Sequence, residues 1–263
     1  MVTIEVGWVT DRGAVRPHNE DSVFVGQQLV AVADGMGGHA AGDVASAMAT
    51  DAVRQLDGQH NLRPDDIVLA LTAVSDAIAS RAEREPERLG MGTTIAGVGI
   101  VVVGGSEHWA IFNVGDSRVY HGHEGELLRA TTDHSEVEEL VTAGKLTAEE
   151  ARVHPNRNVI TRSLGTVPAP QVDIRLIPTA ICERFVVCSD GLVSELDDVE
   201  IATVSMANPV ASGAASALLE AALARGARDN VSVIVLDSRI LAETSPVLEK
   251  TLPRSQLGMA ESG

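Results

Sequence analysis

The chain has 263 residues, of which 44% are hydrophobic and 22% charged, a balance typical of a globular protein with a sizeable buried core. Its formal net charge is −17, and an acidic surplus of that size repels phosphate backbones and anionic lipid surfaces. Three Phe, two Trp and one Tyr are its only aromatic residues, so we expect no platform for stacked bases and no nucleic-acid partner.

Export and membrane signals are missing from the sequence. The first residues, MVTIEVGWVTDRG, have neither the basic flank nor the hydrophobic segment of a signal peptide, and no apolar run reaches about 18 residues. Cys182 and Cys188 lie in one apolar stretch with no second pair to complete a zinc site. We therefore expect a cytoplasmic protein with no membrane span in this chain, in which both cysteines are reduced core residues.

The first part of the chain predicts three strands, a loop and two helices. Apolar alternation and short apolar runs predict strands at the start, at 23–25 and at 29–33. The Gly-rich segment 35–42 predicts a loop. Apolar residues then recur at helical spacing over 43–56 and 64–85, with Pro64 well placed in a first helical turn.

The second part predicts a run of strands and then mixed elements. Four strands separated by Gly-containing turns predict one antiparallel meander, at 93–103, 107–114, 118–123 and 127–130. After them we expect helices at 135–143, 147–153, 199–205 and 209–225 and strands at 172–176, 184–188 and 231–237. Adjacent strands and paired helices indicate an α+β fold with antiparallel sheets.

One domain accounts for residues 1–240. Residues 241–263 lose all periodicity and are rich in Ser, Thr, Pro and Glu, which predicts a disordered C-terminal tail.

Acidic residues gather in the turns between strands. Asp34-Gly35 and Asp190-Gly191 directly follow apolar strand residues, so each carboxylate is placed at the rim of a sheet while the glycine lets the backbone turn. A single Asp-Gly pair is more often only a turn. Several such turns in a strongly acidic chain favour Mn²⁺ or Mg²⁺, which prefer oxygen ligands. Two ions about 4 Å apart can activate a water for attack on phosphorus.

Seven short strings carry a resemblance to a known family. In chain order they are RPHNEDS (16–22), DGMGGH (34–39), MGTT (91–94), NVGDSR (113–118), TDHS (132–135), SDGL (189–192) and RDNV (228–231). Their order resembles that of the type 2C metal-dependent protein phosphatases, the PPM family, and most of all its bacterial serine/threonine phosphatase branch. The resemblance implies a β-sandwich of two antiparallel sheets flanked by helices on both faces, with a binuclear metal site at one end.

The resemblance also assigns metal ligands. Asp34 would bridge both ions and Gly35 would offer its backbone carbonyl to one of them. Asp190 and Asp229 would hold the other ion. Asp116, again with Asp190, would bind a third and weaker ion, as in bacterial relatives.

Three further positions of the strings have implied roles or raise a question. Glu20 would anchor metal-bound water, while its neighbour Asp21 points to the other side of a strand and would brace the loop. Arg16 would bind the substrate phosphate through its planar guanidinium, and it joins Asp34 and Asp190 as a catalytic residue. Met36 stands where animal relatives carry a histidine that is a candidate general acid, so the proton donor to the leaving group stays open, with metal-bound water as a candidate, and we name no protein acid.

The resemblance implies a protein serine/threonine phosphatase that uses two or three Mn²⁺ or Mg²⁺ ions and metal-activated water on phosphoserine and phosphothreonine. Its partners would be phosphorylated proteins, including the Ser/Thr kinases it would counteract, and we expect a monomer. A two-metal nuclease or phosphodiesterase is the enzymatic alternative, and the net charge argues against it. A degenerate binding module is the other, and the complete set of Asp residues argues against that. His134 opens a predicted helix, and we assign it no chemistry.

Overall fold

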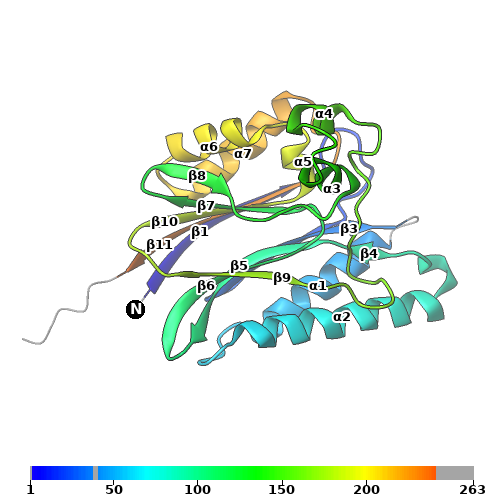
Figure 1. The fold of residues 1–263 in the computed structure, drawn as a ribbon, viewed down its shortest axis with the longest axis horizontal. Coiled ribbons are helices and arrows are strands. Elements are labelled where there is room, and N and C mark those ends of the chain that lie inside the picture. Colours follow the sequence, from blue (N-terminus) through cyan, green and yellow to red (C-terminus); the bar gives the residue numbers. More distant parts are fainter. Residues whose placement is uncertain (1, 38–40, 241–263) are drawn as a thin grey trace, which may run out of the picture.

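The computed structural model describes residues 2–37 and 41–240, so the predicted tail and part of the Gly-rich segment 35–42 lie outside the described residues. One antiparallel sheet has the strand order β1-β11-β10-β7-β8. Its strands are β1 (Val2–Asp11), β11 (Val231–Ile240), β10 (Glu183–Cys188), β7 (Arg118–His123) and β8 (Glu126–Arg129). Two helices pack on its outer face, α6 (Asp198–Ala207) and α7 (Ala211–Ala224) (Figure 1).

The second sheet is also antiparallel and has the order β2-β3-β5-β6-β9, with β4 paired to β3. Its strands are β2 (Asp21–Val25), β3 (Leu29–Met36), β4 (Gly92–Thr93), β5 (Ile95–Val103), β6 (Ser106–Val114) and β9 (Asp173–Pro178). The long helices α1 (Gly42–Leu56) and α2 (Pro64–Arg84) cover its outer face, and the short η1 (Pro86–Arg88) follows α2. The predicted sandwich with helices on both faces is confirmed.

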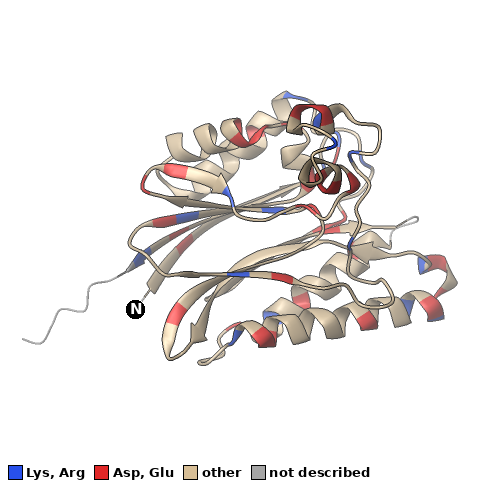
Figure 2. Ribbon diagram, viewed as in Figure 1, with Lys and Arg blue, Asp and Glu red and all other residues tan. Residues whose placement is uncertain are grey.

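The remaining helices gather at one end of the sandwich, where α3 (Glu136–Thr142), α4 (Ala148–Val153) and α5 (Asp190–Val193) lie near one another (Figure 1). Acidic residues recur along α2 and around α3 and α4, with basic residues interspersed (Figure 2). Across residues 2–37 and 41–240, each helix is either too short or too polar for a bilayer crossing.

The central strands of each sheet are buried on both faces, which explains their near-continuous apolar runs, whereas the edge strands β1 and β9 are more exposed. On β6, Trp109 and Ile111 pack between the two sheets, whereas Ala110 and Phe112 pack toward α1 and α2. A third cluster joins the other sheet to α6 and α7. Because neighbouring side chains point to opposite sides of a strand, a strand buried on both faces needs apolar residues at every position.

The predicted four-strand meander is wrong. β5 and β6 pair with each other in one sheet, whereas β7 and β8 pair in the other, so the chain crosses between the sheets after Val114. Gly115 lies in this crossing with a φ of 109°, a conformation that favours glycine. Strand alternation could not show this, because it reveals which residues are buried but not against which sheet.

Three local expectations also need correction. Gly35 and Met36 belong to β3, where they pair with Thr93 and Gly92 of β4, and are not part of a loop. Cys188 is buried as expected, but Cys182 is exposed in the turn before β10. Asp190 opens the short helix α5 and does not lie in a simple turn.

Candidate active site

Four of the predicted carboxylates lie at the same end of the sandwich. Asp34 is near the end of β3, Asp116 lies in the crossing after β6, Asp190 follows β10, and Asp229 lies just before β11. Asp34 feels the charges of Asp190 and Asp116, and Asp190 feels that of Asp229. The structure therefore brings together residues that are almost 200 positions apart in the sequence.

The glycines after two of these residues are required by close backbone approach. A Cβ on Gly35 would lie 2.1 Å from the carbonyl oxygen of Gly42, at the start of α1. A Cβ on Gly191 would lie 2.0 Å from the carbonyl oxygen of Asn230. Any side chain would push these segments apart, so the Asp-Gly pairs reflect packing at the site as well as turning of the chain.

The buried carboxylates have abnormal pKa values. Burial raises the pKa of Asp34 and of Asp116 well above the ordinary value, and the charge of Asp190 raises both further. Burial is also the main cause that raises the pKa of Asp190, followed by the charge of Asp229. One oxygen of Asp190, Oδ1, is buried and has no hydrogen-bond partner among the described residues. Crowded carboxylates of this kind are stabilised by protons or by cations.

The donor set fits a hard divalent cation. Carboxylate oxygens and a backbone carbonyl are the ligands that Mg²⁺ and Mn²⁺ prefer, and the unpartnered Oδ1 of Asp190 is an available donor. Among the described residues, no three His, Cys, Asp or Glu side chains lie close enough together to hold one metal ion.

Arg16 and Glu20 border the carboxylates from the segment between β1 and β2. Nη2 of Arg16 lies 2.5 Å from Oδ2 of Asp229, and the Arg16 side chain is 53% exposed. Arg16, which is predicted to bind the substrate phosphate, thus lies at the site and forms an ion pair with the predicted metal ligand Asp229. Glu20 lies near Asp43. Burial is the main cause that raises the pKa of Glu20, and the negative charge of Asp43 raises it further.

Several residues that support the site are not predicted by the sequence. The Asn230 side chain donates to the carbonyls of Arg12 and His18 (2.9 Å each) and accepts from the Glu20 amide (2.8 Å). It therefore ties the segment that carries Arg16 and Glu20 to the start of β11. The RDNV string was the available signal, because Asn230 directly follows a predicted ligand.

Two hydroxyl residues hold the strand that carries Asp34 and the loop that precedes Asp190. Thr94 Oγ1 accepts from the Asp34 amide (3.0 Å) and lies 2.7 Å from Ser117 Oγ, beside Asp116. Ser189 Oγ donates to Asp21 (2.8 Å), whose pKa burial raises to about 7. Asp21 therefore braces the site from behind.

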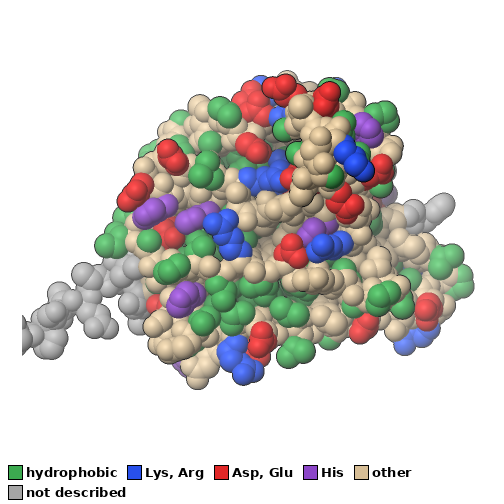
Figure 3. Space-filling model, viewed as in Figure 1, with side chains coloured by type: hydrophobic (Ala, Val, Ile, Leu, Met, Phe, Trp, Pro, Cys, Tyr) green, Lys and Arg blue, Asp and Glu red, His purple; other side chains and the backbone are tan. Residues whose placement is uncertain are grey.

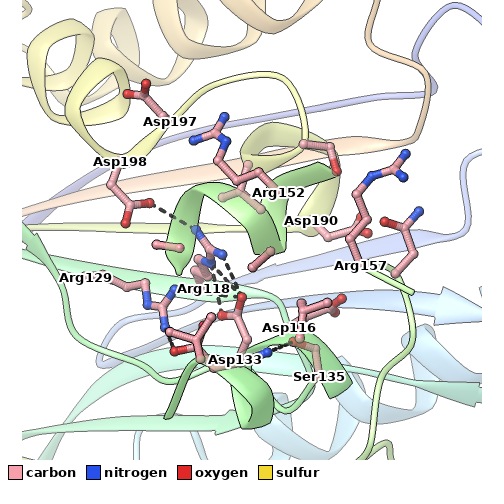
Figure 4. A pocket seen from close by; sticks show the side chains of 18 of the residues that line it. Asp116, Arg118, Arg129, Asp133, Ser135, Arg152, Arg157, Asp190, Asp197 and Asp198 are labelled. Atoms are coloured by element: carbon pink, nitrogen blue, oxygen red, sulfur yellow. Dashed lines mark hydrogen bonds and ion pairs between the residues drawn. The ribbon is translucent and has the colours of Figure 1, made fainter. Parts of the chain in front are cut away.

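A cavity of about 450 Å³ opens beside Asp116 and Asp190, between α3, α4, α5 and the start of α6 (Figure 4). Arg118 lies across it and donates to Asp133 through Nε (3.0 Å) and Nη2 (2.7 Å) and to Asp198 through Nη1 (3.0 Å). The cavity is large enough to admit part of a peptide next to the carboxylates.

Comparison with known proteins identifies relatives over most of the chain. The family described as Protein phosphatase 2C matches residues 16–225. The serine/threonine protein phosphatase PstP of Mycobacterium tuberculosis (strain H37Rv) is 37% identical over 270 residues, which cover 96% of this chain and 51% of that protein. The serine/threonine phosphatase stp of Listeria monocytogenes (serovar 1/2a) is 35% identical over 239 residues, which cover 87% of this chain and 93% of that protein.

A solved structure shares the fold. It is the crystal structure of the catalytic domain of the serine threonine protein phosphatase PstP in complex with two manganese ions. Its TM-score is 0.82 at 36% sequence identity, over 91% of this chain and 100% of that chain. The present chain spans about half the length of the PstP proteins that it matches.

Proposed function

This chain belongs to the protein phosphatase 2C family, as its seven strings predicted, and we propose that it is a metal-dependent protein serine/threonine phosphatase. The observation that carries the proposal is the cluster of Asp34, Asp116, Asp190 and Asp229 at one end of the sandwich. The raised pKa values of its buried members indicate a site that is built to hold positive charge.

Two Mn²⁺ or Mg²⁺ ions are the cofactors we propose, supported by the two manganese ions in the related PstP structure. Asp34, the Gly35 carbonyl, Asp190 and Asp229 would hold this pair, and Glu20 would orient water beside it. Asp116 with Asp190 would hold a weaker third ion. Bound ions of this kind supply positive charge for the phosphoryl oxygens and activate water for attack on phosphorus.

The chain's own residues would bind and orient the phosphate. Arg16 carries an exposed guanidinium that contacts the cluster at Asp229, and the bond is formed by its Nη2. Its other N–H groups have no hydrogen-bond partner among the described residues, so they can donate to two phosphate oxygens at once. The cavity beside Asp116 and Asp190 leaves room for the peptide that carries the phosphorylated residue.

We propose phosphorylated proteins as substrates, including Ser/Thr kinases, and a monomeric enzyme. A cytoplasmic location is part of the same proposal, and the two free cysteines support it because thiols stay reduced in that compartment.

Hydrolysis of a phosphothreonine peptide tests the function. We expect phosphate release that depends on added Mn²⁺ or Mg²⁺ and stops in EDTA. Asp34→Asn should remove the activity, whereas Asp51→Asn should not, because Asp51 is an exposed helix residue that pairs with its neighbour Arg54.

Bis-p-nitrophenyl phosphate, a phosphodiester, separates the proposal from its enzymatic alternative. Faster turnover of the diester than of the peptide would favour a phosphodiesterase. Full peptide hydrolysis in EDTA would contradict the metal-dependent mechanism.

A further inference from the structure

His134 has no predicted role in the chemistry, yet its side chain is buried and fully hydrogen-bonded. Its side chain is only 6% exposed and both ring nitrogens have partners. Nδ1 lies 3.0 Å from the Gly115 amide nitrogen, and Nε2 lies 3.1 Å from Oδ2 of Asp173 on β9. The ring therefore joins the crossing that carries Asp116 to the edge strand of the second sheet.

The partners of His134 determine which ring nitrogen carries the hydrogen. A backbone amide can only donate, so Nδ1 must accept from Gly115 and Nε2 must donate to Asp173. Nη1 of Arg162 donates to the other oxygen of Asp173 (3.0 Å) and also lies 3.2 Å from Nε2 of His134, so it contacts the carboxylate and the ring together. The Gly115 amide and the Asp173 carboxylate thus fix the ring in the form that accepts at Nδ1 and donates at Nε2. Because Nε2 carries the hydrogen, Arg162 donates to Asp173 and not to the ring.

The main chain of His134 reinforces this arrangement. Its amide donates to the Gly115 carbonyl (2.9 Å), and its carbonyl accepts from the amide of Thr161 (2.7 Å). Thr161 and Arg162 lie on the chain that returns from α4, so this segment and the Gly115 turn are attached to the same residue. Basic, acidic and histidine side chains meet near the middle of the face seen in Figure 3.

Gly115 is also packed closely against Thr94. Its φ of 109° favours glycine, and a Cβ there would lie 2.5 Å from the Thr94 side chain. The Asn113 side chain also donates to its carbonyl (3.1 Å). Asp116 is the next residue, so the position of its carboxylate depends on how the Gly115 peptide is held.

We propose that His134 is a positioning residue that places Asp116 for the weak metal site by accepting the Gly115 amide hydrogen. The inference rests on the proposed function through the ligand role of Asp116. It assigns to Asp173 and Arg162 the task of holding the ring, and neither residue touches the four carboxylates.

Two conservative variants separate the two ends of the ring. His134→Asn places an amide oxygen near the position of Nδ1, so it can still accept from Gly115 but cannot reach Asp173. His134→Gln reaches Asp173 but leaves the Gly115 amide without its acceptor. We expect the affinity for the weakest Mn²⁺ ion to fall by at least about tenfold in His134→Gln and to stay near that of the parent in His134→Asn.

The measurements are free Mn²⁺ by electron paramagnetic resonance during a titration and hydrogen exchange of the Gly115 amide. The amide should exchange faster in His134→Gln only. His154→Gln is the matched control, because His154 Nδ1 also accepts a backbone amide hydrogen, from Asn156 (3.2 Å), away from the Gly115 turn.

Equal Mn²⁺ affinity in the two His134 variants, or a Gly115 amide that stays protected in His134→Gln, would overturn the inference. A parent protein that binds no Mn²⁺ would instead remove the proposed function, and the inference with it. The parent titration therefore distinguishes the two failures.

Discussion

At the end of the sandwich opposite the candidate active site, Glu183 is buried at the start of β10, the strand whose other end leads to Asp190. Glu183 accepts hydrogen bonds from Trp109 Nε1 (2.6 Å), His121 Nε2 (2.9 Å) and the Ala180 amide (2.8 Å). Burial acts to raise its pKa, but the bonds from His121, Ala180 and Trp109 outweigh burial and lower it. Asp190 has fewer donors, and one of its oxygens has no partner among the described residues.

The two ends show what a buried carboxylate needs. At the Glu183 end the protein supplies the donors itself, and a bond from Trp109 on β6 to Glu183 on β10 ties one sheet to the other. At the active-site end the neighbours are other carboxylates, which raise one another's pKa values. The hydrogen bonds to Glu183 stabilise the fold. The repulsion among the active-site carboxylates destabilises it, and bound cations would offset that loss.

Asp34→Asn should have the largest effect and opposite signs on activity and stability. We expect kcat to fall by at least about 10²-fold, because a carboxylate that neutralises and positions the proposed ions is lost. In EDTA the free energy of unfolding of the same variant should be about 1 kcal/mol higher than that of the parent, because one of the mutually repelling carboxylates is removed. Phosphopeptide kinetics and urea unfolding measure the two effects.

Asp51→Asn serves as the control for both measurements. If Asp34→Asn destabilises the metal-free protein as much as an ordinary core substitution does, the carboxylates do not repel one another and the contrast between the ends is lost.

Glu183→Ala should destabilise the protein by about 3 kcal/mol without changing kcat. The substitution leaves three donors without their acceptor, the buried Trp109 Nε1 and the partly buried His121 and Ala180 groups, and opens a cavity between the sheets. Glu183→Gln should cost less, because it keeps the side-chain volume and one acceptor oxygen.

Urea unfolding of both Glu183 variants beside Glu126→Ala, an exposed strand glutamate on β8, provides the comparison. A loss in Glu183→Ala no larger than that in Glu126→Ala would show that the bond between the sheets contributes nothing.

Arg16→Ala should act mainly on KM. If Arg16 binds the phosphate equally in ground and transition states, its loss weakens binding by about 1.5–3 kcal/mol and changes kcat less. Arg16→Lys should restore only part of the loss, because an ammonium keeps the charge but cannot make the forked contact. An unchanged KM for a phosphopeptide in folded Arg16→Ala would mean that Arg16 serves Asp229 alone.

The two ends also differ in how well the sequence predicts them. The active-site carboxylates follow apolar strands in recognisable strings, so their residue types and chain order predicted a common site. Glu183 stands in no such string, and its role depends on Trp109 and His121, which lie on two other strands. A bond between partners so distant in sequence leaves no local pattern.

The elements of the fold were predictable for a similar reason, and their assembly was not. Alternation and apolar periodicity predicted most of the strands and helices, because they record which faces are buried. The division of the strand run into two sheets depends on the crossing at Gly115, and the extension of β3 through Met36 depends on pairing with β4. Both features are tertiary contacts that a local pattern does not contain.

The smallest effect we expect is a dependence of metal-free stability on pH to which the active-site end contributes and Glu183 does not. Glu183 has a lowered pKa, so its contribution is fully present above the ordinary glutamate pKa and is lost only as the pH falls through the lowered value. Asp21 behaves in the opposite way, because burial raises its pKa to about 7. The folded protein therefore binds more protons than the unfolded chain between about pH 4 and pH 7.

From this sign it follows that the metal-free protein should gain stability as the pH falls from about 7.5 to about 5.5, by on the order of 1 kcal/mol. Asp21→Asn, which keeps an acceptor for Ser189 but cannot titrate, should reduce that gain, and the difference between variant and parent isolates Asp21 from the histidines. Saturating Mn²⁺ should reverse the slope, because metal ligands must be deprotonated. Urea unfolding in EDTA at several pH values measures the gain. Identical slopes for the parent and Asp21→Asn would show that the carboxylate behind the site titrates alike in the folded and unfolded chains, and that burial at this end has no cost for the added cations to offset.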